Sequence, residues 1–256
     1  MRRLRFLAGP VVLLLLAACG SGGATASARP SDQPPVLDAH VYAAVGASET
    51  VGVGSEHPER DAWTQVFYRT ALPDSAVFYN FGEPGITVRQ ALDQEVPSAL
   101  AVHPDLVTVW LNTNDILHQV PVEAYQDQLD RLVLALRQGG RARVLVANTP
   151  VLDGLPSYRE CLQQPPGPRC LVRGQAVPQP AQLTALVARY NSAIAAVAER
   201  RGAILVDLNC QGDMAALHPD WLSSDGFHPN ARGYAAIAAA FASATRGERC
   251  PKPPRS

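Results

Sequence analysis

Asp225 and His228 are spaced so that one side chain can orient the other. The segment 224–230 reads Ser-Asp-Gly-Phe-His-Pro-Asn. An Asp three residues before a His, on a loop entering a helix, can hold one ring nitrogen while the other nitrogen faces a serine hydroxyl. The chemistry would be general base catalysis. Since such a pair also arises by chance, it supports catalysis only if a nucleophile lies near it.

Ser48 is the candidate nucleophile. It follows the apolar run 41–45 in the segment 46–50, Gly-Ala-Ser-Glu-Thr, so we expect it on the turn that leaves a buried strand. Taken alone, this segment favours an ordinary turn, because Ser and Gly are common turn residues. The G-x-S-x-G elbow of α/β-hydrolases is absent, and His57 interrupts a G-x-G-x-x-G dinucleotide fingerprint.

Two further segments offer neutral hydrogen-bond donors. Gly82, in the segment Asn-Phe-Gly-Glu-Pro-Gly, leaves its backbone N–H open to a substrate oxygen because it has no side chain. Asn114 offers a carboxamide N–H after the next apolar run, 106–111. Such donors can stabilise an oxyanion. The alternatives are a tight turn at Gly82 and an Asx turn at Asn114.

Short apolar runs alternate with longer helical patterns, which predicts an α/β fold. The expected strands are apolar enough to be buried on both faces, and we expect them to be parallel. They span 41–45, 77–80, 106–111, 144–147 and 204–207. The expected helices span 61–71, 87–100, 122–138, 181–201 and 231–243, with Pro121 as a first-turn residue, Gly139, Gly140 and Gly202 as stops and Asn230 as an N-cap.

This alternation predicts a doubly wound, mostly parallel five-stranded sheet in flavodoxin-like order, a three-layer sandwich. Ligands bind such sheets at the carboxyl ends of the strands, which is where Ser48, Gly82 and Asn114 are expected. The proline-rich segment 152–180 breaks the alternation. It is either a lid or pocket wall, or a stapled surface loop without a role in the site.

The four segments, in this order, resemble the blocks of the SGNH hydrolase (GDSL-like lipase/esterase) family. The matching residues are Gly46-Ala47-Ser48, Asn80-x-Gly82-x-x-Gly85, Asn114-Asp115 and Asp225-x-x-His228-Pro229. The resemblance spans position 41 to about position 241 and implies the SGNH hydrolase fold. It implies Ser48 as nucleophile, His228 as base and Asp225 as its orienting acid. Gly82, Asn114 and the backbone N–H of Ser48 would form the oxyanion hole.

Three residues depart from the pattern of the family. Ala47 and Glu49 replace the Asp and Leu of the motif that gives the family its name, and Asn112 stands where Gly is usual. None of these changes removes a reacting group. Asn112 could narrow the oxyanion site or shift Asn114, and so affect activity.

The resemblance implies a serine esterase that hydrolyses carboxylic esters through an acyl-enzyme, without a metal or organic cofactor. The expected substrate is a small-molecule, glycan or lipid ester. Two other functions fit the same residues. One is acyl transfer to glycan hydroxyls, and the other is glycan or lipid binding by a catalytically silent lipoprotein.

The N-terminus predicts export and a lipid anchor. Residues 1–18 combine early arginines with a short apolar stretch, typical of a signal peptide, and Cys19 follows Leu-Ala-Ala as in a lipobox. We expect lipidation at Cys19, a flexible tether over 19–35, and anchoring to a bacterial cell envelope. The alternative is an ordinary cleaved signal peptide and a secreted protein. The hydrolase domain then spans 36–250, with a tail at 251–256.

Four cysteines remain: Cys161, Cys170, Cys210 and Cys250. An even number in an exported chain predicts disulfides. We favour the pairs 161–170 and 210–250, with the other two pairings left open. A zinc site is disfavoured by the lack of a C-x-x-C pair and of a histidine cluster.

Charge and length exclude some classes of protein. The 256 residues suit one mid-sized domain, and the net charge of -1 gives no reason to expect nucleic acid as a partner. We expect a monomer that meets the membrane only through its N-terminal anchor.

Overall fold

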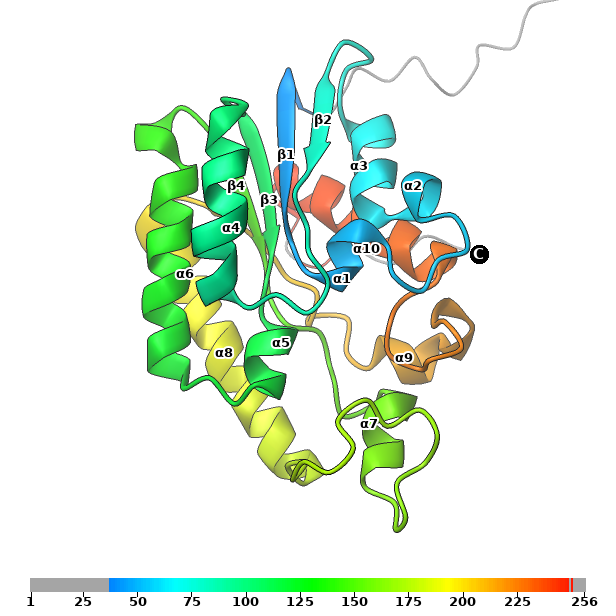
Figure 1. The fold of residues 1–256 in the computed structure, drawn as a ribbon. Helices are drawn as coiled ribbons and strands as arrows, with labels where there is room; N and C mark the ends of the chain where they lie inside the picture. Colours follow the sequence, from blue (N-terminus) through cyan, green and yellow to red (C-terminus); the bar gives the residue numbers. More distant parts are fainter. Residues whose placement is uncertain (1–36, 249, 251–256) are drawn as a thin grey trace, which may run out of the picture. The chain divides into compact units, whose positions relative to one another are not determined.

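A parallel five-stranded sheet forms the centre of the computed structural model, which describes residues 37–248 and residue 250 (Figure 1). The strand order is β2-β1-β3-β4-β5, and each neighbouring pair is parallel. The strands are β1 (Val41–Gly46), β2 (Val77–Asn80), β3 (Leu106–Trp110), β4 (Arg143–Ala147) and β5 (Ile204–Val206). The predicted flavodoxin-like order is therefore confirmed.

The strands differ in how deeply they are buried. All five residues of β3 are buried, and β1 is buried from its second residue onward, as apolar central strands should be. For β2 the expectation of burial on both faces is wrong. This strand pairs only with β1, and its Val77 and Tyr79 side chains are exposed. An apolar run does not report whether a strand lies at the edge of its sheet.

Helices cover both faces of the sheet in Figure 1, and the five predicted ones are present within a few residues. The first is split at Ala62, whose backbone is extended rather than helical. The long helices are α3 (Trp63–Ala71), α4 (Val88–Ala101), α6 (Val122–Leu136), α8 (Pro180–Arg201) and α10 (Ala231–Thr245). The short ones are α1 (Ser48–Val51), α2 (Pro58–Asp61), α5 (Thr113–Leu117), α7 (Pro156–Cys161) and α9 (Met214–Leu217), with 3-10 turns at Gln138–Gly140 and Pro219–Trp221.

Helix ends follow local chemistry. The Asn230 side chain accepts hydrogen bonds from the backbone N–H groups of Arg232 and Gly233, which confirms it as the N-cap of α10. Gly202 ends α8 in the left-handed conformation that glycine adopts without strain. Pro121 is the N-cap residue of α6 rather than part of its first turn, a shift of one position.

The core has one part on each face of the sheet. On one face α4, α6 and α8 pack side by side, with Tyr125, Leu129 and Tyr190 fully buried among them. On the other face α3 packs on α10, and Trp63 stacks on Phe241 with ring centroids 4.0 Å apart. None of the described helices combines the length and apolar character that a bilayer span requires.

Both favoured disulfides are present, Cys161–Cys170 and Cys210–Cys250. The first closes a short loop within the proline-rich insertion, and the second ties the end of the described chain to the segment after β5. The insertion contains α7, which the sequence analysis did not anticipate. The predicted signal peptide and Cys19 lie outside the described residues.

A buried acid supports the end of β1. Glu95, on α4, is 3% exposed, and its Oε2 accepts a hydrogen bond of 3.0 Å from the backbone N–H of Gly46. Its other oxygen has no partner among the described residues, so little compensates a charge there. Burial raises the pKa of Glu95 from 4.5 to about 8.

This raised pKa predicts a pH-dependent stability. Because the native state holds the proton more tightly than the unfolded chain, the contribution is complete below the unfolded pKa near 4.5 and is lost as the pH rises towards 8. We expect Glu95→Gln, which keeps an acceptor but cannot ionise, to weaken the fall of Tm between pH 5 and pH 8. Each kcal/mol of unfolding free energy corresponds to a change of about 2–4 °C in Tm for a domain of this size.

Thermal unfolding of both proteins across that pH range measures the effect. Some slope will remain in the variant, because burial also raises the pKa of Asp115 to about 7. Parallel pH profiles for the two proteins would contradict the assignment.

Candidate active site

Ser48 lies at the carboxyl end of β1, as expected, but it begins a helix instead of a plain turn. Ala47 is the N-cap residue of α1, and Ser48 is the first helical residue. The first N–H groups of a helix have no partner within it, so the Ser48 backbone N–H is left as a donor. The residue is 8% exposed.

Ser48, His228 and Asp225 form one hydrogen-bonded chain. The Nε2 atom of His228 lies 3.0 Å from the Ser48 Oγ, although the two residues are 180 positions apart. The Nδ1 atom of His228 lies 2.6 Å from the Oδ2 of Asp225. With Nδ1 held by a carboxylate, Nε2 is in position to accept the serine proton.

Asp225 is held ionised by its neighbours. Its Oδ1 accepts hydrogen bonds from the Ser223 hydroxyl at 2.6 Å and from the backbone N–H groups of Phe227 and His228 at 2.8 and 3.0 Å. Burial alone would raise its pKa, but these bonds and the contact with the His228 ring lower the pKa of Asp225 to about 2. Ser223 was not among the predicted site residues, because its only signal in the sequence is a serine two positions before Asp225.

Glu49 is a second acceptor beside the nucleophile. The Ser48 hydroxyl lies 3.2 Å from the Oε2 of Glu49, close to its 3.0 Å distance from His228. A hydroxyl has a single proton, so the two acceptors compete for it. This contact depends on Glu49 standing where the family motif has Leu, a departure noted in the sequence without a contact assigned to it.

Gly82 lies on the loop after β2, which is bound to the nucleophile segment. The Asn80 side chain donates to the Thr50 carbonyl at 2.9 Å, and the backbone N–H of Glu83 donates to the Gly46 carbonyl at 2.9 Å. Gly82 packs so closely that an added Cβ would lie 2.8 Å from the Thr50 side chain. Its N–H donates to the Asn80 Oδ1 at 3.0 Å, so a substrate oxygen would share or replace that bond.

Asn114 lies in the first turn of the short helix α5. Its Nδ2 donates to the Ile86 carbonyl at 3.0 Å, which joins α5 to the Gly82 loop. A carboxamide nitrogen carries two hydrogens, so Asn114 can donate a second bond. Asn112 is buried, and its Nδ2 donates to the Ala147 carbonyl at the end of β4.

Two neighbours pack against the His228 side chain. Phe227 packs edge-to-face against its ring, with ring centroids 4.8 Å apart. Gly54 lies close to its Cβ, and an added Cβ on Gly54 would lie 2.7 Å from the His228 Cβ. Sequence reasoning considered Gly54 only as a possible member of a dinucleotide motif, because a close approach of this kind leaves no local pattern.

Comparison with known proteins identifies the family of this chain. The model of the GDSL-like lipase/acylhydrolase family matches residues 44–236. The chain belongs to this family. The match includes the nucleophile segment, the Gly82 and Asn114 segments and the loop with Asp225 and His228. No curated protein matches the sequence.

Solved structures share the fold of this GDSL-like hydrolase. A lipase/acylhydrolase from Enterococcus faecalis is 18% identical, with TM-score 0.58, and the alignment covers 85% of this chain and all of that one. An esterase from a Pseudoalteromonas species is 19% identical, with TM-score 0.58, and the alignment covers 81% of this chain and 97% of that one. A mutant acetyl-xylooligosaccharide esterase from Geobacillus is 18% identical, with TM-score 0.58, and the alignment covers 83% of this chain and 96% of that one. The family identifies the protein as an ester hydrolase, and these neighbours share its fold.

Metal ligands are not gathered in the described part of this GDSL-like hydrolase. Within residues 37–248 and 250, no group of three or more His, Cys, Asp and Glu side chains is placed to hold a metal ion.

The contact between Gly54 and His228 predicts a selective loss of activity. In Gly54→Ala the added methyl would displace His228, and a shift of about 1 Å in a catalytic group can cost about a hundredfold in rate. We expect ester hydrolysis to fall by about that factor. Gly139→Ala is the matched control, because Gly139 also has a positive φ but an added Cβ there meets nothing within 4 Å.

Initial rates on a soluble ester, with Tm for each variant, measure this effect. Both variants replace a positive-φ glycine, at φ 96° for Gly54 and 69° for Gly139, and the Tm of each reports its backbone strain separately from the rate. Equal rates in Gly54→Ala and Gly139→Ala would contradict the predicted displacement.

Proposed function

We propose that this GDSL-like hydrolase is a serine esterase that works through an acyl-enzyme. The observation that carries the proposal is the continuous chain from Ser48 Oγ to His228 Nε2 and from His228 Nδ1 to Asp225 Oδ2, at 3.0 and 2.6 Å. This is the arrangement in which a base removes the proton from a hydroxyl as it attacks a carbonyl carbon.

The reaction has two halves. Ser48 Oγ bonds to the carbonyl carbon while His228 Nε2 takes its proton, and His228 then gives that proton to the leaving alcohol oxygen as the ester C–O bond breaks. Water, activated by His228 in the same way, attacks the acyl-enzyme and releases the acid. Asp225, ionised because its pKa is about 2, stabilises the imidazolium in both halves.

The oxyanion is held by neutral N–H donors. In this proposal they are the Ser48 backbone N–H at the start of α1, the Gly82 backbone N–H and the Asn114 Nδ2. The hydrogen bonds that join these three segments support the assignment, because preorganised donors stabilise developing charge without reorganisation.

The enzyme acts outside the cytoplasm in this proposal. Residues 1–18 direct export, Cys19 becomes the lipid anchor, and residues 19–35 tether the domain to the bacterial cell envelope. The two disulfides support export, because disulfides persist in oxidising compartments.

The anchor is tested by Cys19→Ser. Lipidation requires the thiol, so we expect the variant to leave the detergent phase for the aqueous phase in a phase partition, while ester hydrolysis by the domain is unchanged. Partitioning of both wild type and variant into the aqueous phase would argue for a secreted protein without a lipid.

The triad is tested by p-nitrophenyl acetate and butyrate turnover. We expect Ser48→Ala and His228→Ala to lose about a thousandfold or more in kcat, because nucleophile and base act as a unit. Ser98→Ala and His103→Ala, at exposed positions outside the site, are the matched controls.

A fluorophosphonate probe provides an independent measurement, because it reacts with an activated serine. The Pseudoalteromonas esterase is described as inhibited by monoethylphosphonate, a related reagent. We expect labelling of wild type and of both controls, and none of Ser48→Ala. Equal turnover by wild type and both triad variants would refute the proposal.

A further inference from the structure

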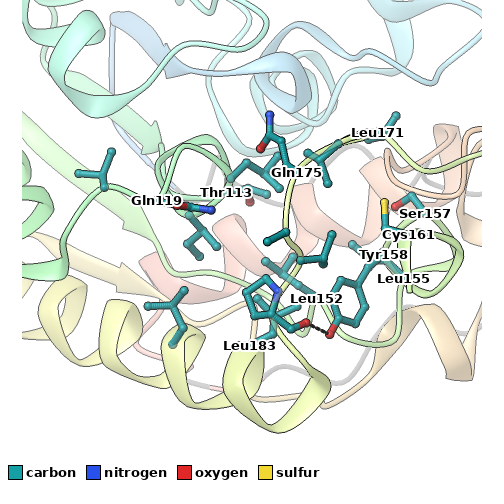
Figure 2. Close-up of a pocket in the computed structure, with 18 of the residues that line it drawn as sticks. Thr113, Gln119, Leu152, Leu155, Ser157, Tyr158, Cys161, Leu171, Gln175 and Leu183 are labelled. Carbon is teal, nitrogen blue, oxygen red and sulfur yellow. Dashed lines mark hydrogen bonds between the residues drawn. The ribbon is translucent and has the colours of Figure 1, made fainter. Parts of the chain in front are cut away.

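An apolar cavity of about 360 Å³ lies beside the catalytic loop, between the α5–α6 region, α8 and the insertion (Figure 2). Its walls include Leu152, Leu155, Tyr158 and Leu183, each at most 8% exposed. Its charged lining residues, among those described, are Glu123 and Arg189. These two exposed side chains form an ion pair with each other at 2.9 Å, which leaves the interior uncharged.

The cavity shares residues with the catalytic segments. Thr113, which lines it, immediately precedes the oxyanion donor Asn114, and Phe227, which also lines it, immediately precedes His228 and packs against the His228 ring. Figure 2 shows Thr113 on the opposite side of the cavity from Leu155 and Tyr158. The cavity is therefore bounded by the segments that carry Asn114 and His228.

The insertion builds one wall and is fixed to the catalytic loop. The backbone N–H of Ser157 donates to the Gly226 carbonyl at 3.1 Å, and a Cβ on Gly226 would lie 2.9 Å from Pro156. The insertion is also braced internally. The Tyr158 hydroxyl donates to the Pro178 carbonyl at 2.7 Å, and a disulfide joins Cys161 to Cys170. A disulfide and hydrogen bonds therefore hold this wall in place.

We propose that this cavity binds the acyl chain of the ester, so that the preferred substrates are esters of medium-length fatty acids. The proposal rests on the esterase function proposed above. A cavity of about 150 Å³ holds benzene, with its six carbons, and about 360 Å³ is more than twice that volume, which leaves room for a chain of roughly ten carbons or more. An apolar chain is the occupant that matches an uncharged interior of this size.

The acyl group fits this position better than the leaving alcohol does. The acyl group stays bound to Ser48 through both halves of the reaction. The alcohol must depart, and water must replace it beside His228. A pocket closed on one side by a crosslinked wall suits the group that stays.

A second, smaller cavity does not serve the same purpose. It has a volume of about 130 Å³ and is separated from the larger one by Thr113, Leu152, Leu155 and Phe227, which line both. This volume is smaller than the cavity of about 150 Å³ that holds one benzene, so a long chain has much less room there than in the larger cavity. Chain-length preference should therefore depend on the larger cavity.

The test is a series of p-nitrophenyl esters from acetate to laurate, in which only the acyl group changes. Each methylene buried in an apolar site adds a factor of about four in kcat/KM, so we expect decanoate to exceed acetate by about a hundredfold or more. Decyl acetate, with its long chain in the alcohol, should gain much less over ethyl acetate.

Filling the cavity should remove this preference. We expect Leu183→Trp to lower the ratio of decanoate to acetate turnover by about tenfold or more while acetate turnover remains. Leu186→Trp, at a less buried lining position, is the second variant in case the first does not fold. Leu134→Trp is the matched control, since Leu134 is exposed on α6 and does not line the cavity.

Direct binding separates failure of this inference from failure of the esterase function. A fluorescent fatty acid should bind Ser48→Ala and be displaced by decanoate but not by acetate, and Leu183→Trp or Leu186→Trp should weaken its binding. This readout needs no catalysis, so it applies even if no ester is hydrolysed. Equal turnover across the ester series, or filling variants that leave both the chain-length ratio and the probe binding unchanged, would overturn the acyl-chain assignment.

Discussion

The parallel alignment of the strands is the constraint on which the site depends. In a sheet of this kind every carboxyl end lies at one edge, so Ser48, Gly82 and Asn114 leave different strands towards the same place. Hydrogen bonds between their loops then fix the relative positions, as between Glu83 and Gly46. Because side chains alternate between the two faces, a slip of one residue in β1 would turn its core side chains to the opposite face.

His228 reaches this edge on a loop that backbone hydrogen bonds close at both ends. The backbone N–H of Ser223 donates to the His228 carbonyl at 2.9 Å, and that of Asn230 donates to the Trp221 carbonyl at 2.8 Å. Asn230 also caps α10, which packs against α3. The position of the imidazole is thus determined by a helix start and a short closed loop, both encoded within a few residues.

The sequence predicts features that depend on local patterning. The strand order, the ends of the long helices and the nearness of Ser48 to His228 follow from apolar periodicity and from the rule that strand ends meet. Local patterning does not predict three other features: the exposure of β2, the contact of Glu49 with Ser48 and the approach of Gly54 to His228. They depend on which distant segments touch, and a single sequence carries no distances. The large cavity is missed for the same reason, since its walls come from three separate regions.

The attachment of the insertion bears on how such an enzyme can diversify. Residues 152–180 connect β4 to α8 and contribute no strand to the sheet, so their length and composition can change without altering the alignment of the nucleophile and the base. The bond from Ser157 to Gly226 limits that freedom at one point. Arg169, within the Cys161–Cys170 loop, also lies close to Gly226, where an added Cβ would meet its side chain at 3.2 Å. Both parts of the insertion must therefore stay compatible with the loop that carries Asp225 and His228.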